Sequence, residues 1–330
     1  MRTSEKKSTL VFPRDASSPG CAVGVSISGE RVHREYGVAN LETNLSISTK
    51  TVFRAASLSK QFTAMCVALL VTKNALSLDD EIQEHVPELP KYDWPVTLRH
   101  LLHHTSGMPD YMNVMLEKGI KEDQPCSAET VLEGLKERKL GFEPGEKMEY
   151  SNSGYFLMSF VVRNITGKSL RAYAKENIFD PLGMTNSHFH DRWDEPVDNE
   201  AIGYINTSEG IEAIQIRWDS VGDGGLFTTV EDLFLWNENF DHNILGDEAL
   251  HLTLTPGRLN DGSEIDYALG HMIQEYRGMS VFHHSGSFGG FKANMLRFPE
   301  KQASVVCLAN IDTLDAKAIT YAFADVYVHS

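Results

Sequence analysis

A serine and a lysine three residues apart, Ser57 and Lys60, stand at the start of an apolar stretch that runs to Leu70. The small and apolar residues of this stretch predict a helix that is buried on nearly every side, with both polar residues on one face near its N-terminus. Burial disfavours the ammonium form of a lysine, and a neutral amine can accept the proton of a serine hydroxyl. The pair could therefore supply a nucleophile and its base.

Two residues at this spacing are a weak motif by themselves. The same spacing occurs at Ser4 and Lys7, in a polar segment at the N-terminus. In the alternative interpretation, Ser57 caps the helix and Lys60 is a solvated lysine of its first turn. Motifs elsewhere in the chain have to decide between these interpretations.

A second group of polar residues, Tyr150 and Asn152, precedes another apolar stretch at 155–165, which predicts a second buried helix. A tyrosine works as an acid or base near neutral pH only if a neighbouring cation stabilises its phenolate, and Lys60 is the candidate cation. The Asn152 amide offers both a donor and an acceptor, which suits contact with a substrate and with the lysine. The alternative is a structural tyrosine at a loop-to-helix junction, and Tyr204-Ile205-Asn206 repeats the spacing in an extended polar stretch.

A third group, His284-Ser285-Gly286-Ser287, lies between two predicted strands. A glycine such as Gly286 permits close approach of the backbone, as a strand that lines a substrate cleft requires. The N–H of Ser287 could join the N–H of Ser57 in an oxyanion hole. The alternative is a glycine-rich turn with a surface histidine.

Composition excludes several classes of partner and cofactor site. The 330 residues include 30 basic and 46 acidic side chains, a net charge of −16, which argues against binding to nucleic acids or anionic membranes. The four cysteines lie far apart, so neither a zinc site nor a disulfide framework is indicated, and Cys66 and Cys307 are expected to be reduced core thiols. His188 and His190 have no clear third ligand for a metal. The glycine-rich run 222–225 lacks the lysine of a phosphate loop and predicts a turn.

The N-terminus shows no apolar segment of signal-peptide length, and the longest apolar stretch is too short to span a bilayer, so we expect a cytoplasmic protein. The alternative is a periplasmic protein whose leader has been removed. Hydrophobic periodicity predicts a loose arm at 1–19, strands near both ends of the chain and helices between them. The predicted strands are 21–27, 32–39, 51–54, 267–273, 279–283, 293–298 and 303–308. The predicted helices are 62–71, 82–86, 97–102, 127–139, 155–165, 169–178, one beginning at Thr228 or Thr229, and 316–327, with a loop at 103–111.

This order predicts an α/β (α+β) domain in which the first and last segments pair in one antiparallel sheet. We expect a single domain with two lobes, a sheet lobe formed by 20–56 and 245–330 and a mainly helical lobe formed by 57–244.

The three groups, in this order along the chain, resemble the three active-site motifs of the penicillin-recognising serine hydrolases. The branch in question includes class C β-lactamases, D-aminopeptidases, low-molecular-weight DD-peptidases and β-lactamase-like esterases. The resemblance covers roughly residues 20–310. It implies a β-lactamase/transpeptidase-like fold, with a central antiparallel sheet flanked by helices, a helical lobe, and a site in the groove between them.

The resemblance also implies roles for individual residues. Ser57 would be the nucleophile, Lys60 its activating partner and Tyr150 the proton shuttle to the leaving group. Asn152 would contact the substrate and Lys60, while His284 and Gly286 would form the opposite wall. The N–H groups of Ser57 and Ser287 would bind the oxyanion. The implied reaction is acyl transfer through an ester of Ser57, which needs neither a metal nor a cofactor; whether Lys60 or Tyr150 takes the first proton stays open.

At one position the chain departs from the β-lactamases of this branch, which usually carry lysine where His284 stands. A histidine, mostly neutral at pH 7, would hold a substrate carboxylate less firmly. The departure favours D-aminopeptidase-like or esterase-like activity on a small molecule or short peptide. The alternatives are a penicillin-binding acyl-acceptor, a weak β-lactamase and a D-alanyl-D-alanine carboxypeptidase. The sequence contains no E-x-x-L-N segment. At its Leu259-Asn260 pair, the position of the glutamate is occupied by Pro256.

Overall fold

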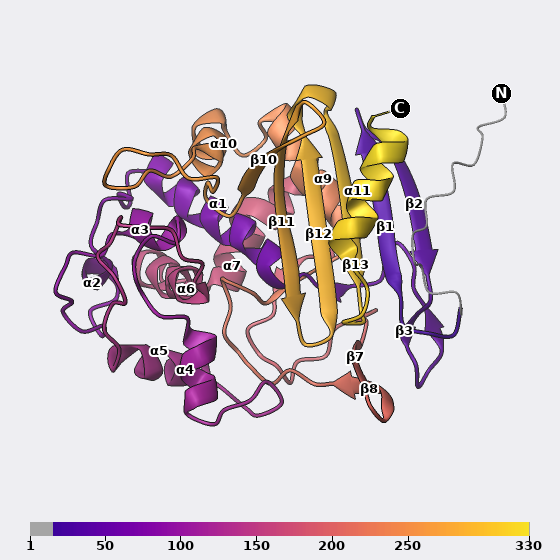
Figure 1. Cartoon of the computed structure of the whole chain (residues 1–330), viewed down its shortest axis with the longest axis horizontal. Helices are drawn as coiled ribbons and strands as arrows, with labels where there is room; N and C mark the ends of the chain where they lie inside the picture. The colour runs from indigo at the N-terminus through magenta and orange to yellow at the C-terminus, as the bar shows by residue number, and fades with distance from the viewer. Residues whose placement is uncertain (1–15, 330) are drawn as a thin grey trace.

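Six antiparallel strands form the central sheet of the computed structural model, which describes residues 16–329 (Figure 1). Residues 1–15 of the predicted arm, with Ser4 and Lys7, lie outside the described part. In spatial order the strands of this sheet are β10 (Met272–Tyr276), β11 (Met279–Phe288), β12 (Phe291–Phe298), β13 (Ala303–Ala309), β1 (Cys21–Ile27) and β2 (Glu30–Tyr36). The first strand of the chain therefore pairs with the last, which confirms the predicted closure of the sheet.

Short strands pair in three smaller sheets. These are β3 (Val38–Asn40) with β4 (Leu45–Ser46), β9 (Leu226–Thr228) between β5 (Phe53–Arg54) and β6 (His188–Phe189), and β7 (Gly203–Thr207) with β8 (Gly210–Ile214). The helices are α1 (Ser59–Thr72), α2 (Ile82–His85), α3 (Leu98–Leu102), α4 (Tyr111–Glu117), α5 (Ala128–Lys136), α6 (Asn152–Thr166), α7 (Leu170–Ala174), α8 (Asp180–Leu182), α9 (Val230–His242), α10 (Asp247–Leu254) and α11 (Ala316–Tyr327). Shorter helical turns lie at Ala56–Leu58, Lys175–Phe179 and Pro299–Lys301.

Both faces of the central sheet are covered by helices. Alternation along β1 directs Cys21 and Val23 into the cluster beneath α11, whereas Ala22 belongs to the main core on the other face, where α9 packs. On that face a Cβ at Gly24 would lie 2.7 Å from the ring of Phe234, so the glycine allows α9 to approach β1 closely. Figure 1 shows α11 in front of the sheet and α9 behind it. The predicted division into lobes at residues 57 and 244 stays a prediction.

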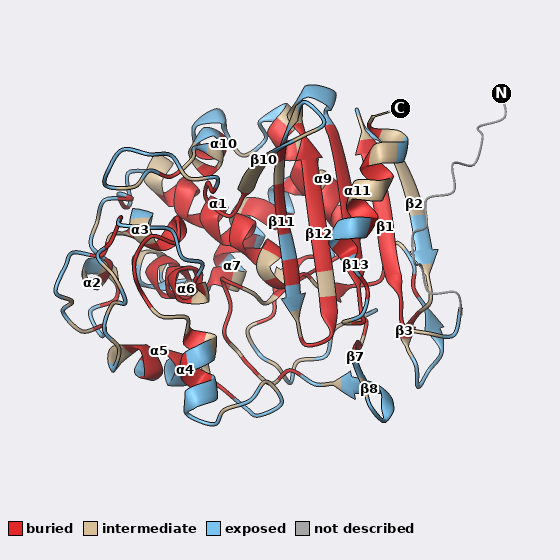
Figure 2. Ribbon diagram, viewed as in Figure 1, coloured by how far each residue is buried: buried red, intermediate tan, exposed pale blue. Residues whose placement is uncertain are grey.

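Helix α1 is the centre of the helical part of the molecule. Its residues 59–70 are all buried, and it packs against α6, α7 and α10, which confirms the prediction of a helix covered on nearly every side (Figure 2). The second predicted buried helix is α6, which begins at the Ser151 cap and ends where Gly167 adopts φ +70°. No helix within residues 16–329 is long and apolar enough to cross a membrane.

Three local differences from the predictions have physical causes. The strand predicted at 267–273 begins only at Met272, because Gly270 turns the chain with φ +79° and lies directly against the backbone of Gln61. The loop predicted at 103–111 ends in α4, whose first turn is capped by the Asp110 carboxylate. Helix α10 was not predicted; it packs against α1.

Candidate active site

The three sequence motifs meet at one cleft of about 730 Å³. Six of the seven predicted site residues line this cleft: Ser57, Tyr150, Asn152, His284, Gly286 and Ser287. The seventh, Lys60, is fully buried (0 % exposed) and hydrogen-bonds to Ser57 and Asn152. Strand β11 supplies one side of the cleft, and the starts of α1 and α6 supply the other.

Lys60 is held by three hydrogen bonds. Its Nζ donates to Ser57 Oγ at 3.1 Å, to Asn152 Oδ1 at 2.8 Å and to the main-chain carbonyl of Asp223 at 2.9 Å. Ser57 lies in the 3₁₀ turn before α1, and the N-cap of α1 is Leu58, without a side-chain cap. The alternative interpretation, a capping serine with a solvated lysine, is therefore wrong.

The turn that presents Ser57 is strained and firmly anchored. Ala56 has φ +46°, a left-handed conformation that residues with a Cβ rarely adopt. The buried hydroxyl of Ser59 donates to Ala56 O at 2.5 Å and accepts the N–H of Leu226 at 3.0 Å. These bonds fasten the turn to β9, so the direction of the Ser57 side chain is fixed by the surrounding fold.

Tyr150 lies at the exposed side of the cleft, with 37 % of its surface accessible. The Nζ of Lys60 lies 4.9 Å from the centre of its ring, which stacks at 4.3 Å on the ring of His104. The ring of His284 lies 6.1 Å away across the cleft. The cation that the sequence assigned to this tyrosine is therefore its neighbour in space.

The orientation of the Asn152 amide is set by Asp110. One carboxylate oxygen of Asp110 accepts both the main-chain N–H of Asn152 at 2.9 Å and its Nδ2 at 2.8 Å, so Oδ1 is directed to Lys60. The hydroxyl of Ser153 donates to Pro109 O and accepts the N–H of Tyr111, which ties the loop to α6. Asp110 lies near the end of the segment 103–111 that the sequence predicted as a loop.

The wall formed by β11 requires Gly286. A Cβ at this position would lie 2.4 Å from Ala55 O and 3.1 Å from Ser57 N, so only glycine allows the strand to approach Ser57 this closely. Strand β10 pairs with β11 only as far as His283, which leaves the following residues with a free edge. Phe288 and Phe291 flank the two-residue turn between β11 and β12, so the N–H of Phe288 points toward β12. The direction of the N–H groups alternates along a strand. We therefore infer that the N–H of Ser287 points to the free edge.

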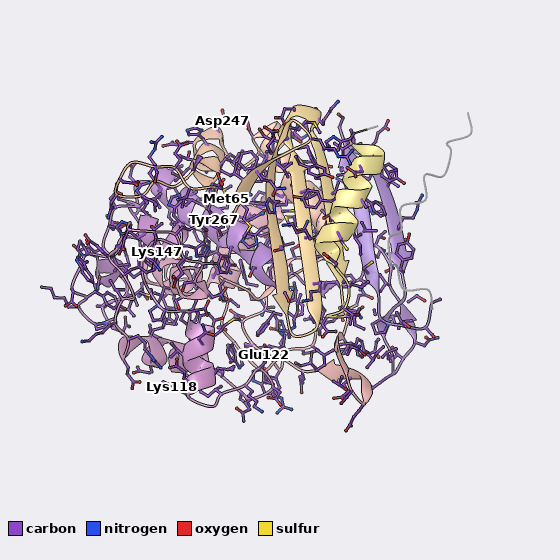
Figure 3. All side chains as sticks on the ribbon, viewed as in Figure 1. Met65, Lys118, Glu122, Lys147, Asp247 and Tyr267 are labelled. Atoms are coloured by element: carbon purple, nitrogen blue, oxygen red, sulfur yellow. The ribbon has the colours of Figure 1, made fainter. Side chains whose placement is uncertain are left out.

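His284 is a neutral residue in this wall. It is 1 % exposed, and burial, together with the nearby positive charge of Lys60, lowers its pKa to about 3. Its Nδ1 lies 2.7 Å from the carbonyl of Ser285, so Nδ1 carries the proton. Nε2 is then an acceptor for the hydroxyl of Tyr267, 3.4 Å away; Figure 3 labels Tyr267 beside α1.

Asp223 was missed as a candidate site residue because the glycine-rich run around it predicted only a turn. The turn is present. The main-chain carbonyl of Asp223 accepts a hydrogen bond from Lys60, and the residue is only 2 % exposed. The hydroxyl of Tyr111 donates to Asp223 Oδ2 at 3.0 Å, and Ser220 Oγ lies 3.2 Å from the same hydroxyl. Burial raises the pKa of this carboxyl to about 6, although the charge of Lys60 opposes the shift.

The other groups that the sequence singled out do not form sites. His188 Nε2 and His190 Nδ1 lie 3.3 Å apart, yet residues 16–329 contain no cluster of three or more His, Cys, Asp or Glu that could hold a metal. Tyr204, from the repeated tyrosine–asparagine spacing, is buried in β7 and accepts the N–H of Leu41. All four cysteines are buried and free, as expected for Cys66 and Cys307: Cys21, Cys66, Cys126 and Cys307.

Comparison with known proteins then identifies the family. The beta-lactamase family profile matches residues 9–327. The chain belongs to the beta-lactamase family. This confirms the resemblance drawn from the three motifs, and the fold of the relatives agrees with the sheet and helices described above.

Curated relatives include a penicillin-binding protein of Bacillus subtilis (strain 168), 30 % identical over 294 residues that cover 84 % of this chain and 65 % of the relative. A D-aminopeptidase of Gluconobacter oxydans (strain 621H) is 30 % identical over 308 residues, covering 91 % of this chain and 57 % of the relative. The chain thus spans about three-fifths of the length of these two relatives.

Solved structures of family members superpose closely. The penicillin-binding protein of Bacillus halodurans has a TM-score of 0.82 at 26 % identity, covering 93 % of this chain and 95 % of its own. The D-amino acid amidase of Ochrobactrum anthropi SV3, complexed with D-phenylalanine, has a TM-score of 0.75 at 25 % identity, covering 90 % and 88 %. An octameric penicillin-binding protein homologue from Pyrococcus abyssi has a TM-score of 0.82 at 27 % identity, covering 93 % and 73 %.

Proposed function

We propose that this beta-lactamase family member is a serine hydrolase that cleaves small amides, short peptides or esters through an acyl-enzyme on Ser57. The observation that carries the proposal is the bond from the fully buried Lys60 Nζ to Ser57 Oγ, 3.1 Å, at the wall of a cleft. A serine hydroxyl in contact with an amine that is shielded from water is arranged for nucleophilic attack.

The reaction proceeds in two steps. Lys60 in its neutral amine form, or Tyr150 as a phenolate, takes the proton of Ser57 as the serine oxygen attacks the substrate carbonyl, and the N–H groups of Ser57 and Ser287 stabilise the oxyanion. Tyr150 passes a proton to the leaving nitrogen or oxygen as that bond breaks. Water then attacks the Ser57 ester and gives one proton to Lys60 or Tyr150. As the ester bond breaks, this proton passes to the Ser57 oxygen, and the acid is released.

The state of His284 favours substrates that are not held by a carboxylate at this wall. A neutral imidazole whose Nδ1–H is already bound to Ser285 O offers no charge to a substrate carboxylate there. We therefore favour aminoacyl amides and esters over β-lactams and peptides that end in D-alanine. The names of the relatives, D-aminopeptidase and D-amino acid amidase, support this choice.

The test is a panel of D- and L-aminoacyl amides, D-alanyl-D-alanine peptides, nitrophenyl esters and nitrocefin, assayed side by side. Repeated turnover that disappears in Ser57→Ala is the expected result. Absence of turnover on every substrate, with no acyl adduct by intact mass, would refute the proposal. The similarity to two penicillin-binding proteins keeps a second candidate, an acyl-acceptor, which would give one stoichiometric burst and a stable adduct on Ser57.

A further inference from the structure

His104 lies directly against Tyr150 and has no role in the reaction described above. Its side chain is 1 % exposed, and its backbone has φ +58°, a conformation that is unfavourable for a residue with a Cβ. The imidazole ring packs on the phenol ring with 4.3 Å between centres and 33° between planes. A partly exposed tyrosine therefore rests on a fully buried and strained histidine.

His104 accepts hydrogen bonds from the main-chain N–H groups of both neighbours of Tyr150. The carbonyl of His104 accepts the N–H of Glu149 at 2.8 Å, and its ring Nδ1 accepts the N–H of Ser151 at 3.2 Å. His104 thus supports the tyrosine at three points: the N–H of the preceding residue, the N–H of the following residue, and the phenol ring. Within residues 16–329 the Tyr150 hydroxyl makes no hydrogen bond, so its position depends on these main-chain bonds and on the contacts of its ring.

The histidine ring is itself fixed by aromatic neighbours. The ring of Tyr267 meets it edge-on at 4.7 Å, and the ring of Tyr155 lies at 5.2 Å. Tyr155 is anchored in turn, because its hydroxyl donates to Leu102 O at 2.7 Å. The support beneath Tyr150 is therefore rigid, which is what a positioning element requires.

The chemistry of the ring suits this role and no proton transfer. Nδ1 can accept the N–H of Ser151 only while it is unprotonated, and burial, with the positive charge of Lys60, holds the pKa of His104 well below its usual range. The remaining charged or titratable neighbours are Tyr150, Tyr155, Tyr267, His103 and His284. The ring Nε2 has no hydrogen-bond partner within the described chain.

We propose that His104 is a positioning residue that holds the Tyr150 hydroxyl where it can deliver a proton to the leaving group. This inference rests on the proposed function, because it concerns the step in which the substrate bond breaks. A displacement of a catalytic group by about 1 Å can cost about 100-fold in rate, so the loss of a three-point support should be measurable.

The informative substitution is His104→Asn. Asparagine tolerates the left-handed backbone better than other side chains, and its amide oxygen can still accept a main-chain N–H, but it removes the ring beneath Tyr150. His103→Asn is the matched control. His103 is also buried, and burial lowers its pKa to about 4, but its ring bonds to Arg99 O and packs beside Gly257.

The experiment compares kcat/KM for a nitroanilide and a nitrophenyl ester that share one acyl group. The anilide nitrogen must be protonated as it leaves, whereas nitrophenolate leaves without a proton. We expect His104→Asn to lower the anilide value about 100-fold and the ester value by less than about 5-fold, with His103→Asn near wild type. In a Tyr150→Phe background, His104→Asn should cause no further loss on the anilide.

Unchanged rates on both substrates, or an equal further loss in the Tyr150→Phe background, would overturn the proposal. Equal losses on both substrates that vanish in the Tyr150→Phe background would support it and would assign Tyr150 to the first proton transfer as well. Thermal unfolding and circular dichroism check that the variants fold. If His104→Asn does not fold, His104→Gly carries the same test, because glycine adopts the left-handed backbone without strain and also removes the ring beneath Tyr150. A wild-type protein inactive on both substrates would instead refute the proposed function, so the two failures are distinguishable.

Discussion

Replacing Asp223 by asparagine should stabilise the fold at neutral pH, because the native structure confines an ionised carboxyl away from water. Burial raises the folded-state pKa of Asp223 to about 6, from an ordinary value of 3.8. A raised carboxyl pKa means that ionisation disfavours the folded state. This penalty is absent below pH 3.8, develops between pH 3.8 and 6, and is complete above pH 6.

The size of the penalty follows from the difference between 6 and 3.8, at 1.36 kcal/mol for each pH unit, which is about 3 kcal/mol. The attraction to Lys60 is already contained in this value, since its charge lowers the pKa. Asparagine can still accept the hydrogen bond from the Tyr111 hydroxyl, and the main-chain carbonyl that binds Lys60 is unchanged. The substitution removes the charge, but it also places the amide Nδ2 where Asp223 Oδ1 has no hydrogen-bond partner within residues 16–329, a cost that does not depend on pH. The difference in gain between pH 8 and pH 4.5 therefore reports the charge.

The assay is urea unfolding of wild type and Asp223→Asn at pH 8 and pH 4.5. The variant should gain about 3 kcal/mol at pH 8 and only about 1 kcal/mol at pH 4.5, with unchanged dependence on urea. Glu209→Gln, an exposed substitution, controls for removal of one negative charge from a chain of net charge −16. A gain that does not depend on pH, or a loss of stability at pH 8, would refute the account of this carboxyl.

Three further predictions concern the site itself. Lys60→Ala should lower kcat/KM by about 10⁴-fold with an unchanged circular dichroism spectrum, and near-wild-type activity would contradict its role. Gly286→Ala places a Cβ 2.4 Å from Ala55 O, so activity should fall about 100-fold, whereas Ser280→Ala on the exposed part of the same strand should be neutral; equal rates for the two variants would contradict the close-approach argument. His284→Lys should raise kcat/KM on carboxylate-bearing substrates about tenfold relative to neutral esters, with His284→Gln as the uncharged control, and an unchanged ratio would show that the charge at this wall does not select substrates.

Local patterns in the sequence were sufficient to locate the main site. The serine–lysine pair on one helical face requires only the geometry of a helix turn, and the structure has Lys60 Nζ 3.1 Å from Ser57 Oγ. Closure of the sheet by its first and last strands followed from the distribution of alternating segments. The predicted ends of strands were wrong where a contact with another segment sets them. At Gly270, for example, the chain bends against α1, and β10 begins only after this bend.

The residues that support the site could not be found in the same way, because their partners are distant in sequence. Asp110 orients Asn152 from 42 positions away, and the Asp223 carbonyl reaches Lys60 across 163 positions. His104 accepts the N–H of Ser151, next to Tyr150, from 47 positions away. Each of these residues stands in a segment whose composition indicates only a loop.

Polar side chains within a helix that is buried on every side are themselves a signal of such partners. In α1, the hydroxyl of Thr63 donates to Gly222 O, and Gln61 Oε1 accepts the indole N–H of Trp236. A buried polar group without a partner costs about 1–3 kcal/mol, so each such residue requires a donor or acceptor from another segment. Lys60 obeys the same rule, and one of its three acceptors is a nucleophile. The polar residues of α1 therefore indicate that neighbouring segments must supply hydrogen-bond partners. Which segment supplies each partner is decided by the fold.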